Sequence, residues 1–255
     1  MTSNPSRTAL VTGGARRIGR TIALALAQRG WDVAVHYHHS EAEALTAVAE
    51  IEALGRRAAA FCCDLADEAA SKALLGRVTA ELGQVSCLVN NASLFENDSA
   101  ADFSLARLDA HMHANLAAPI LLSQALHQAT PAGSQSVVIN LLDQKLFNLN
   151  PDFLSYTLSK AALHSATTML AQALAPKVRV VGVAPGISLI SGNQSEGGFA
   201  KAHAQTPLGR SSTPDDIAAA VCFLAEAPAI TGTTLVVDGG QHLIPLPRDV
   251  MFLAK

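Results

Sequence analysis

The chain carries little charge. Charged side chains make up 15% of its 255 residues, and the formal net charge is only −3. Such a weak charge gives no general attraction to nucleic acid or to an anionic membrane surface. No apolar run reaches the roughly 20 residues that a membrane-spanning helix requires. The start, Met1–Arg7, lacks the apolar stretch of ~7–15 residues that is typical of signal peptides, so we expect a cytoplasmic protein.

Cysteine is scarce and is not arranged as a metal or redox site. None of the four cysteines forms a Cys-x-x-Cys pair, and each lies in an apolar stretch, so we expect buried free thiols. They are Cys62, Cys63, Cys87 and Cys222. The cluster of His36, His38 and His39 has no thiol or carboxylate at ligand spacing, so we predict no metal site.

The chain does contain a regular alternation of short apolar runs with longer stretches of helical period. Runs without polar alternation predict strands that are buried on both faces of a sheet. Strands are expected at 8–11, 33–35, 58–62, 87–89, 137–142, 178–183 and 234–237. Helices are expected at 18–29, 41–54, 68–82, 105–128, 156–174 and 215–224. This alternation predicts one α/β domain over 1–255, a Rossmann-type, doubly wound, parallel seven-stranded sheet with helices on both faces.

Two irregular segments lie where specificity is expected, and a separate apolar tail follows the last expected strand. Residues 143–155 join the fifth strand to the helix of Tyr156. Residues 187–212 have weak periodicity, so we predict a partly helical flap over the site. The tail 241–255 is too apolar to extend into solvent, and we predict that it packs on the core or on a neighbouring subunit.

A glycine-containing turn, Thr12–Gly19, follows the first strand and opens the first helix. In that context backbone N–H groups and the helix dipole can hold a pyrophosphate. The second strand lacks the terminal acid that would bind the ribose 2′-hydroxyl of NAD, and Arg17 adds a cation able to bind phosphate. The sequence therefore favours NADPH. Asp64 can accept a hydrogen bond from the adenine amino group or can serve as a cap or turn residue, and both interpretations stay open.

Tyr156 and Lys160 are four residues apart and therefore share one face of the expected helix. A Lys ammonium beside a Tyr can stabilise the phenolate and make the Tyr a proton donor near neutral pH. Such a pair suits delivery of a proton to an atom that has just received a hydride.

No hydroxyl stands thirteen residues before Tyr156, where a carbonyl reductase needs one; the residue there is Asp143. An ionised carboxylate repels a carbonyl oxygen but accepts hydrogen bonds from ring or exocyclic nitrogens. Asp143 therefore favours a substrate with N–H groups or a protonatable C=N bond. A structural role for Asp143 as a cap at the strand end is the alternative.

Together these motifs resemble the short-chain dehydrogenase/reductase superfamily over essentially the whole chain. The elements that carry the resemblance are Thr12–Gly19, Asn90-Asn91-Ala92-Ser93, Asn115, Tyr156 with Lys160, Pro185-Gly186, Thr231-Gly232 and Asp238-Gly239-Gly240. Arg17, where the superfamily usually has Gly, and Asp143, where it has a catalytic Ser, look like the pteridine reductase branch. That branch includes dihydromonapterin reductases, also called alternative dihydrofolate reductases. It often has Arg at the position of His39.

The resemblance implies roles for individual residues. Tyr156 would donate the proton, Lys160 would hold the nicotinamide ribose and lower the Tyr pKa, and Asn115 would hold a relay water, with Asp143 as the fourth catalytic residue. The implied cofactor contacts are Gly13, Arg16, Arg17, Ile18, Gly19, His36, Tyr37, His38, His39, Ser40, Asp64, Leu65, Asn91, Ala92, Ser93, Tyr156, Lys160, Pro185, Gly186 and Ser188. The implied substrate contacts are Arg17, Ser93, Phe95, Asp143 and Tyr156. Phe95 would stack on the pterin face; a place in the core is the alternative.

We therefore predict an NADPH-dependent reductase that transfers a hydride to a C=N bond of a dihydropterin such as dihydromonapterin or dihydrofolate. Two alternatives remain open: a reductase of a carbonyl substrate, such as a 3-oxoacyl thioester or a sugar ketone, and a non-catalytic NADP(H)-sensing protein. The resemblance, with apolar surface on the helices at 105–128 and 156–174, implies a homotetramer without nucleic-acid or membrane partners.

Overall fold

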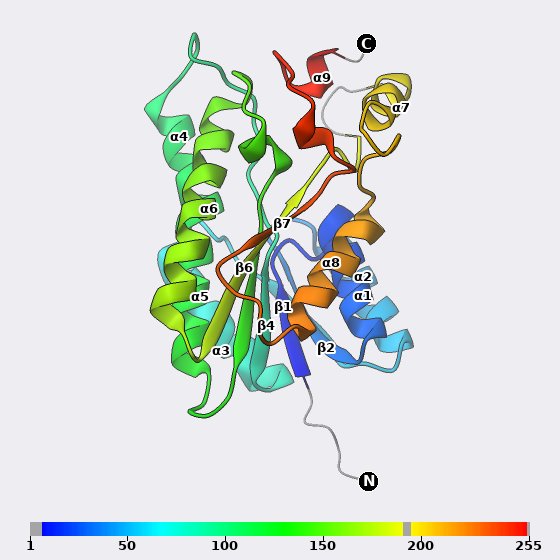
Figure 1. Ribbon diagram of the computed structural model, residues 1–255. Coiled ribbons are helices and arrows are strands. Elements are labelled where there is room, and N and C mark those ends of the chain that lie inside the picture. The colour runs from blue at the N-terminus through cyan, green and yellow to red at the C-terminus, as the bar shows by residue number, and fades with distance from the viewer. Residues whose placement is uncertain (1–6, 191–194, 254–255) are drawn as a thin grey trace.

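A single parallel sheet organises the molecule (Figure 1). The computed structural model describes residues 7–190 and 195–253. Its 7-stranded sheet has the order β3-β2-β1-β4-β5-β6-β7. The strands are β1 (Arg7–Val11), β2 (Trp31–Tyr37), β3 (Ala58–Cys62), β4 (Val85–Asn90), β5 (Ser136–Leu141), β6 (Val178–Pro185) and β7 (Thr234–Val237). This confirms the predicted fold class, and the direction of winding reverses between β1 and β4, where such sheets bind their ligands.

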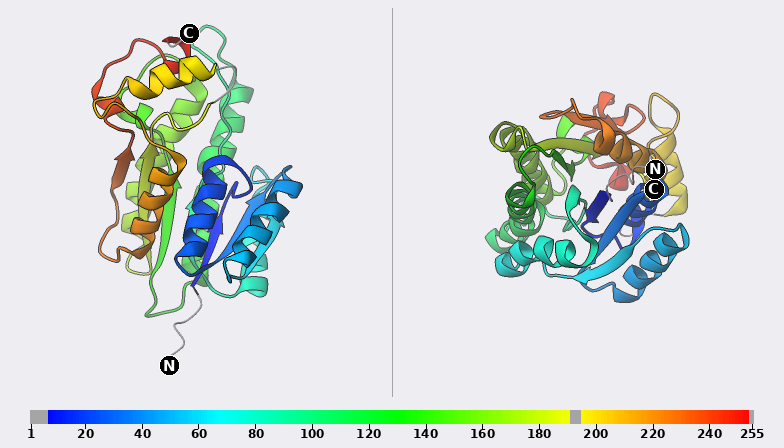
Figure 2. Two further views of the ribbon diagram at one scale, coloured as in Figure 1. Left: turned by 90° about the vertical axis from the view of Figure 1, so that its right-hand side faces the viewer. Right: turned by 90° about the horizontal axis from the view of Figure 1, so that it is seen from below.

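Helices cover both faces of the sheet (Figure 2). One face packs against α1 (Arg17–Gln28), α2 (Glu41–Ala53) and α8 (Pro214–Glu226). The other face packs against α3 (Glu68–Leu82), α5 (Ala118–Ala129) and α6 (Leu154–Leu174). Within β1, Ala9 and Val11 join the first core and Leu10 the second, because successive strand residues point to opposite faces. Full burial on both sides explains why the strands read as uninterrupted apolar runs.

The expected helix at 105–128 is divided into three parts. α4 (Leu105–Met112) passes into a π-helical turn at His113–Ala117, and α5 follows without a loop. Such π turns inside a helix occur frequently at functional sites. Here the turn contains Asn115, one of the residues that the sequence predicts to be catalytic.

Helices α7 and α9 lie at the carboxyl ends of the strands (Figure 1). α7 (Glu196–Ala204) falls within the predicted flap, and the part of that flap at 191–194 lies outside the described residues. Beyond β7 come a 3-10 turn at Gln241–Leu243 and α9 (Val250–Leu253). In residues 7–190 and 195–253, the helices lack the combination of length and apolar character that crossing a membrane needs.

Candidate active site

A cleft of about 230 Å³ opens at the carboxyl ends of the strands, beside the point where the winding reverses. Its walls come from the turn after β1, the loops after β4, β5 and β6, α6 and the C-terminal tail. The lining residues are Arg17, Ile18, Asn91, Ser93, Phe95, Leu141, Leu142, Asp143, Gln144, Lys145, Tyr156, Lys160, Pro185, Gly186, Ile187, Ser188, Leu189, Gln241, Asp249, Val250 and Met251. The structure thus brings together all five predicted substrate contacts.

Asp143, Tyr156 and Lys160 form the polar centre of this cleft. The Tyr156 hydroxyl donates a hydrogen bond of 2.8 Å to Asp143 Oδ2. The Lys160 ammonium donates to the backbone oxygen of Leu141 at 2.7 Å and lies 5.9 Å from the centre of the Tyr156 ring. Tyr156 and Lys160 are buried and Asp143 is partly buried, so the charges in this centre are screened less than on an open surface.

The protonation states in this centre differ from those that the resemblance implies. Burial and the neighbouring Asp143 carboxylate raise the pKa of Tyr156 well above its ordinary range. Burial also raises the pKa of Asp143 and lowers that of Lys160 to about 8. The predicted lowering of the Tyr156 pKa is therefore wrong for this structure, because its hydroxyl faces a carboxylate while the ammonium bonds to a backbone oxygen. Tyr156 is consequently a protonated phenol at neutral pH.

Asn115 fixes the loop that follows β4. Its side-chain amide donates to Leu94 O at 2.9 Å and to Ser159 Oγ at 3.0 Å, and its Oδ1 accepts from the Leu94 N–H at 2.8 Å. Asn115 is not among the residues that line the cleft in the described part of the chain. These bonds occupy the polar atoms of the Asn115 side chain, and the relay water assigned to Asn115 stays a prediction.

The turn between β1 and α1 is supported from below by His36. The Gly13 N–H donates to His36 Nδ1 at 3.0 Å, and His36 Nε2 lies 3.0 Å from Cys63 O, to which it can donate. Burial lowers the pKa of His36 to about 4, which keeps the ring neutral. Both ring nitrogens are thus engaged, Nδ1 with the turn and Nε2 with Cys63, and the predicted contact of His36 with the cofactor stays a prediction.

The turn itself has the features that a dinucleotide requires. A Cβ added to Gly19 would lie 2.1 Å from Gly13 O and 2.5 Å from Asn91 Nδ2, so only glycine allows this close approach. Within the described residues, the N-cap residue of α1, Arg16, makes no side-chain hydrogen bond to the helix. The N-terminal end of α1 is thus available to an anion, and the residues present fit a pyrophosphate.

Arg17 adopts a left-handed backbone conformation, with φ of 53°. This conformation explains why glycine is the usual residue at that point of the turn, since L side chains pay a steric cost there. The guanidinium Nη2 donates to Ile190 O at 2.9 Å, which connects the turn to the predicted flap. Arg17 therefore lies between the nucleotide and substrate ends of the cleft.

The end of β2 carries the residues expected near the 2′-phosphate. The rings of His38 and His39 stack with centroids 3.6 Å apart, and His38 Nε2 lies 4.0 Å from Asp64 Oδ2. Asp64 Oδ1 accepts from the Ala66 N–H at 2.9 Å, which is a turn contact, whereas Asp67 caps α3. Among the described residues no group of His, Cys, Asp or Glu has the arrangement of a metal site.

Phe95 lies at the mouth of the cleft and not in the core. Its ring stacks on Phe153 with centroids 4.5 Å apart and meets the edge of Tyr156 at 4.7 Å. The side chain is still 43% exposed, so it can present apolar surface to a flat ligand.

Ser188, a predicted cofactor contact, lines the cleft and is held by two hydrogen bonds. Its buried hydroxyl donates to Gly186 O at 2.7 Å and shares a 3.0 Å hydrogen bond with Ser212 Oγ. These bonds fix the base of the predicted flap, and the contact of Ser188 with the cofactor stays a prediction.

The helix that carries Tyr156 is anchored by a residue far away in sequence. Phe153 stands at the N-cap position of α6 with a left-handed φ of 56° and makes no side-chain capping bond. Asp98 supplies the cap instead, because its Oδ1 accepts from the Ser155 N–H at 2.8 Å and its Oδ2 from the Ser155 hydroxyl. The negative charge of this carboxylate also interacts favourably with the positive end of the helix dipole.

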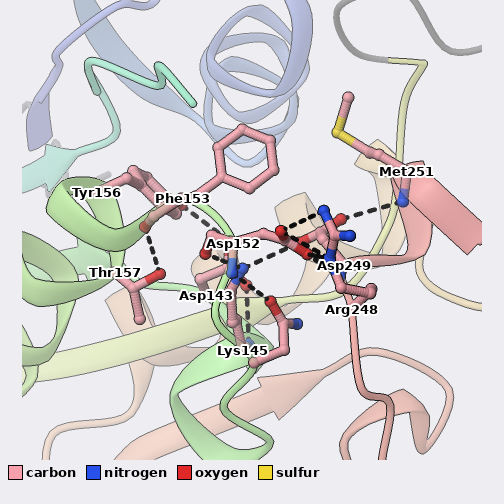
Figure 3. Close-up of polar contacts among 10 residues, drawn as sticks. Asp143, Lys145, Asp152, Phe153, Tyr156, Thr157, Arg248, Asp249 and Met251 are labelled. Atoms are coloured by element: carbon pink, nitrogen blue, oxygen red, sulfur yellow. Dashed lines mark hydrogen bonds and ion pairs between the residues drawn. The ribbon is translucent and has the colours of Figure 1, made fainter. Parts of the chain in front are cut away.

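Sequence reasoning missed the contribution of the tail. Asp249, Val250 and Met251 line the cleft, and the ion pair of Lys145 with Asp249 joins the tail to the turn behind Asp143 (Figure 3). No local pattern indicates a contact between residues more than a hundred positions apart. Gln144 was also missed, although its position beside Asp143 was an available signal. Among the described residues its buried Oε1 has no hydrogen-bond partner.

Comparison with known proteins places the chain in a large group of enzymes. The family model described as enoyl-(acyl carrier protein) reductase matches residues 13–242. The L-rhamnose 1-dehydrogenase (NAD(P)(+)) of Sphingomonas sp. (strain SKA58) is 33% identical, over 93% of this chain and 96% of that protein. The 3-oxoacyl-[acyl-carrier-protein] reductase FabG of Staphylococcus aureus (strain Mu50 / ATCC 700699) is also 33% identical, over 93% and 99%.

A solved structure resembles the whole fold. The FolM alternative dihydrofolate reductase 1 from Brucella canis, complexed with NADP, has a TM-score of 0.90 and 38% identity, and the match covers 95% of this chain and 96% of that one. The assembled Tyr156–Lys160 pair, the glycine turn and the parallel sheet agree with this match. The chain belongs to the short-chain dehydrogenase/reductase superfamily, in the family described as enoyl-(acyl carrier protein) reductase.

Proposed function

We propose that this protein is an NADPH-dependent reductase of a dihydropterin, such as dihydromonapterin or dihydrofolate, which it converts to the tetrahydro form. The observation that carries the proposal is the hydrogen bond between the Tyr156 hydroxyl and Asp143 Oδ2 inside the cleft. This carboxylate can accept hydrogen bonds from N–H groups of a pterin, whereas a ketone oxygen offers it none. The likeness to the Brucella dihydrofolate reductase supports the same substrate class.

The general activity is that of an NADP-dependent oxidoreductase. The glycine turn and the uncapped end of α1 would hold the pyrophosphate, and Lys160 would bind the nicotinamide ribose. When bound, the cofactor supplies the hydride. The intact pair of Tyr156 and Lys160 argues against a purely sensing role, because a sensor needs no proton donor.

The residues of the cleft then have definite tasks. Phe95 offers its exposed ring to the flat heterocycle, and Asp143 orients the heterocycle through its N–H groups. Tyr156 and Asp143 hold one proton close to the reacting bond, and they titrate as a coupled pair. As negative charge develops on the substrate nitrogen, this pair delivers the proton to it. Burial raises the Asp143 pKa, so this carboxyl group takes up a proton more readily than a carboxyl group in water does.

Replacement of Asp143 by serine tests the substrate class. In a dihydropterin reductase Asp143→Ser and the isosteric Asp143→Asn should each lose about 10²-fold or more in kcat/KM. A carbonyl reductase should keep or gain activity on ketones with Asp143→Ser, because the serine hydroxyl can bind a carbonyl oxygen. The measurement is NADPH oxidation with dihydromonapterin, dihydrobiopterin, dihydrofolate and a panel of ketones. Faster reduction of a ketone than of any pterin by the unaltered enzyme contradicts the proposal.

The carbonyl alternative deserves that direct test because two relatives at 33% identity are named for sugar and 3-oxoacyl substrates. The assays should therefore also include L-rhamnose with NADP+, followed as NADPH formation, and a 3-oxoacyl thioester with NADPH. Neither is expected to react at a rate comparable with a dihydropterin, since the Asp143 carboxylate occupies the place where the oxygen of such a substrate would need a donor.

We further propose a cytoplasmic homotetramer. Large apolar side chains are exposed on α6 at Leu158 and Met169, on α8 at Phe223 and on β7 at Leu235. These residues lie on one helix of each face of the sheet and on the edge strand, which are surfaces that subunit contacts can cover. Light scattering coupled to size exclusion should give a mass four times that of one chain, and a monomer would contradict this proposal.

A further inference from the structure

Two ion pairs attach the C-terminal segment Arg248–Leu253 to the loop between β5 and α6 of the same chain (Figure 3). Arg248 Nη2 lies 2.7 Å from Asp152 Oδ1, and Lys145 Nζ lies 3.2 Å from Asp249 Oδ2. The backbone N–H of Asp249 adds a hydrogen bond of 2.7 Å to Asp152 Oδ2. The segment that supplies cleft wall is therefore held to the loop between β5 and α6.

Lys145 is the central residue of this attachment. Its side chain is only 3% exposed, and a buried ammonium requires a paired charge and further acceptors. Asp249 provides the carboxylate, and Asp152 O accepts a second hydrogen bond of 2.6 Å. The backbone N–H of the same Lys145 donates to Asp143 Oδ1 at 2.8 Å. A continuous chain of polar contacts thus runs from Asp249 through Lys145 to Asp143 and on to Tyr156.

Aromatic packing gives a second and independent connection. Phe252 stacks on Phe153 with ring centroids 5.9 Å apart, and Phe153 in turn stacks on Phe95 at 4.5 Å. Asp249 also organises the segment itself, since its Oδ1 accepts from the Met251 N–H at 3.1 Å where α9 begins. The tail therefore touches both the polar and the aromatic side of the cleft.

We propose that Arg248–Leu253 is a wall of the substrate site and that Asp249, acting through Lys145, is a positioning residue for Asp143. The role assigned to Asp143 rests on the proposed function, whereas the attachment of the tail does not. The charged and titratable groups that face Asp143 are Tyr156 and Lys160 from α6, Lys145 from its own turn and Asp249 from the tail. Arg17 lines the same cleft.

Kinetics of an isosteric variant test the positioning role. Asp249→Asn keeps the shape but removes the charge, and it should raise KM for the dihydropterin and lower kcat/KM by roughly tenfold to a hundredfold, because a shift of ~1 Å in a catalytic group has that cost. The Asp249 charge raises the Asp143 pKa, so Asp249→Asn should also move the Asp143 limb of the pH profile to lower pH. Asp249→Glu should recover part of both effects.

Arg248→Gln is the matched control, because it breaks the other ion pair of the same segment and leaves Lys145 with its partner. We expect this variant to loosen the tail without moving the pH profile. An equal shift of the profile in both variants, or no shift in Asp249→Asn, overturns the positioning role. If Asp249→Asn does not fold, the double variant Lys145→Met with Asp249→Leu removes both buried charges. It should raise KM to a similar extent, and an unchanged KM overturns the proposal.

Hydrogen exchange supplies a readout that needs no substrate. In Asp249→Asn, with NADPH bound, amide exchange should increase both in the tail from Arg248 to Leu253 and in the turn Gln144–Phe147. Faster exchange in the tail alone means that Asp249 does not act on Asp143 and overturns the positioning role. If the unaltered enzyme reduces no dihydropterin, the proposed function fails, but the exchange result still decides how the tail is attached.

Discussion

The nucleotide end and the substrate end of this cleft are built in different ways. The turn after β1 is fixed by neighbours on adjacent strands, since the Gly13 N–H bonds to His36 and the side chain of Asn91 bonds to Thr12 O at 2.9 Å. The substrate end is assembled from the loop before α6, the segment after β6 and the tail, which meet only in the folded chain. One end therefore follows from strand geometry, while the other depends on long-range pairs.

The N-termini of α1 and α6, the two helices that border the cleft, show the same contrast. The N-cap residue of α1, Arg16, provides no side-chain cap, whereas Asp98 caps the N-terminus of α6. The free N–H groups at the start of α1 can therefore bind an anionic ligand. At the start of α6 they bond to Asp98, which holds the helix that carries Tyr156 in place. The difference indicates which helix binds and which helix carries chemistry.

The largest effect is expected from removing the proton donor at the substrate end. Tyr156→Phe should lower kcat by about 10²–10⁴-fold, because proton transfer then lacks its acid. NADPH binding should stay close to that of the unaltered enzyme, since the turn after β1 is untouched. Steady-state rates and NADPH fluorescence titration check both statements, and a parallel loss of cofactor binding would show that the two ends are not independent.

A substitution at Gly19 should weaken the nucleotide end of the cleft and leave the substrate end intact. Gly19→Ala places a Cβ 2.1 Å from Gly13 O, so the turn must shift. We expect NADPH affinity to fall by roughly a hundredfold, about 2.8 kcal/mol. Gly76→Ala in α3 is the control, because its Cβ would meet nothing within 4 Å and alanine favours a helix. Equal losses in the two variants would contradict the assigned role of Gly19.

His36→Gln tests the support beneath the turn through pH. Folded His36 stays neutral down to its pKa of about 4, whereas the unfolded ring takes up a proton near its ordinary pKa of 6.5. Its contribution to stability is therefore complete above pH 6.5 and lost as pH falls to 4. The unaltered protein should lose about 3 kcal/mol over that window, and His36→Gln correspondingly less. Urea unfolding at several pH values measures the difference, and identical pH dependence in both proteins would refute the assignment.

The smallest effect is expected at the cap of α6. Asp98→Ala should cost about 1–2 kcal/mol of stability and lower kcat, because it frees the start of the helix that carries Tyr156. Asp67→Ala removes the comparable cap of α3, which carries no cleft residue, so it should cost a similar amount of stability and leave kcat unchanged. A reduced kcat in both variants would point to a general loss of folded enzyme.

The sequence was sufficient for what depends on periodicity and adjacency. The strand pattern, the glycine turn and the Tyr156–Lys160 face could all be predicted, because each is a local consequence of residue spacing. Three contacts could not be predicted. They are the hydrogen bond of buried His36 to the turn, the anchoring of the loop after β4 by Asn115, and the ion pair of Asp249 with Lys145. Each depends on which distant segments meet in the folded chain, and no local sequence pattern indicates that.

The attachment of α9 beside the cleft has a practical meaning for anyone preparing this enzyme. A polypeptide fused behind α9 would begin next to the substrate entrance, where Val250 and Met251 already contribute surface. β1 begins at the opposite end of the sheet, far from that entrance (Figure 1). Affinity tags and fluorescent fusions therefore belong on the amino-terminal side, where they leave access to the reductase centre unobstructed.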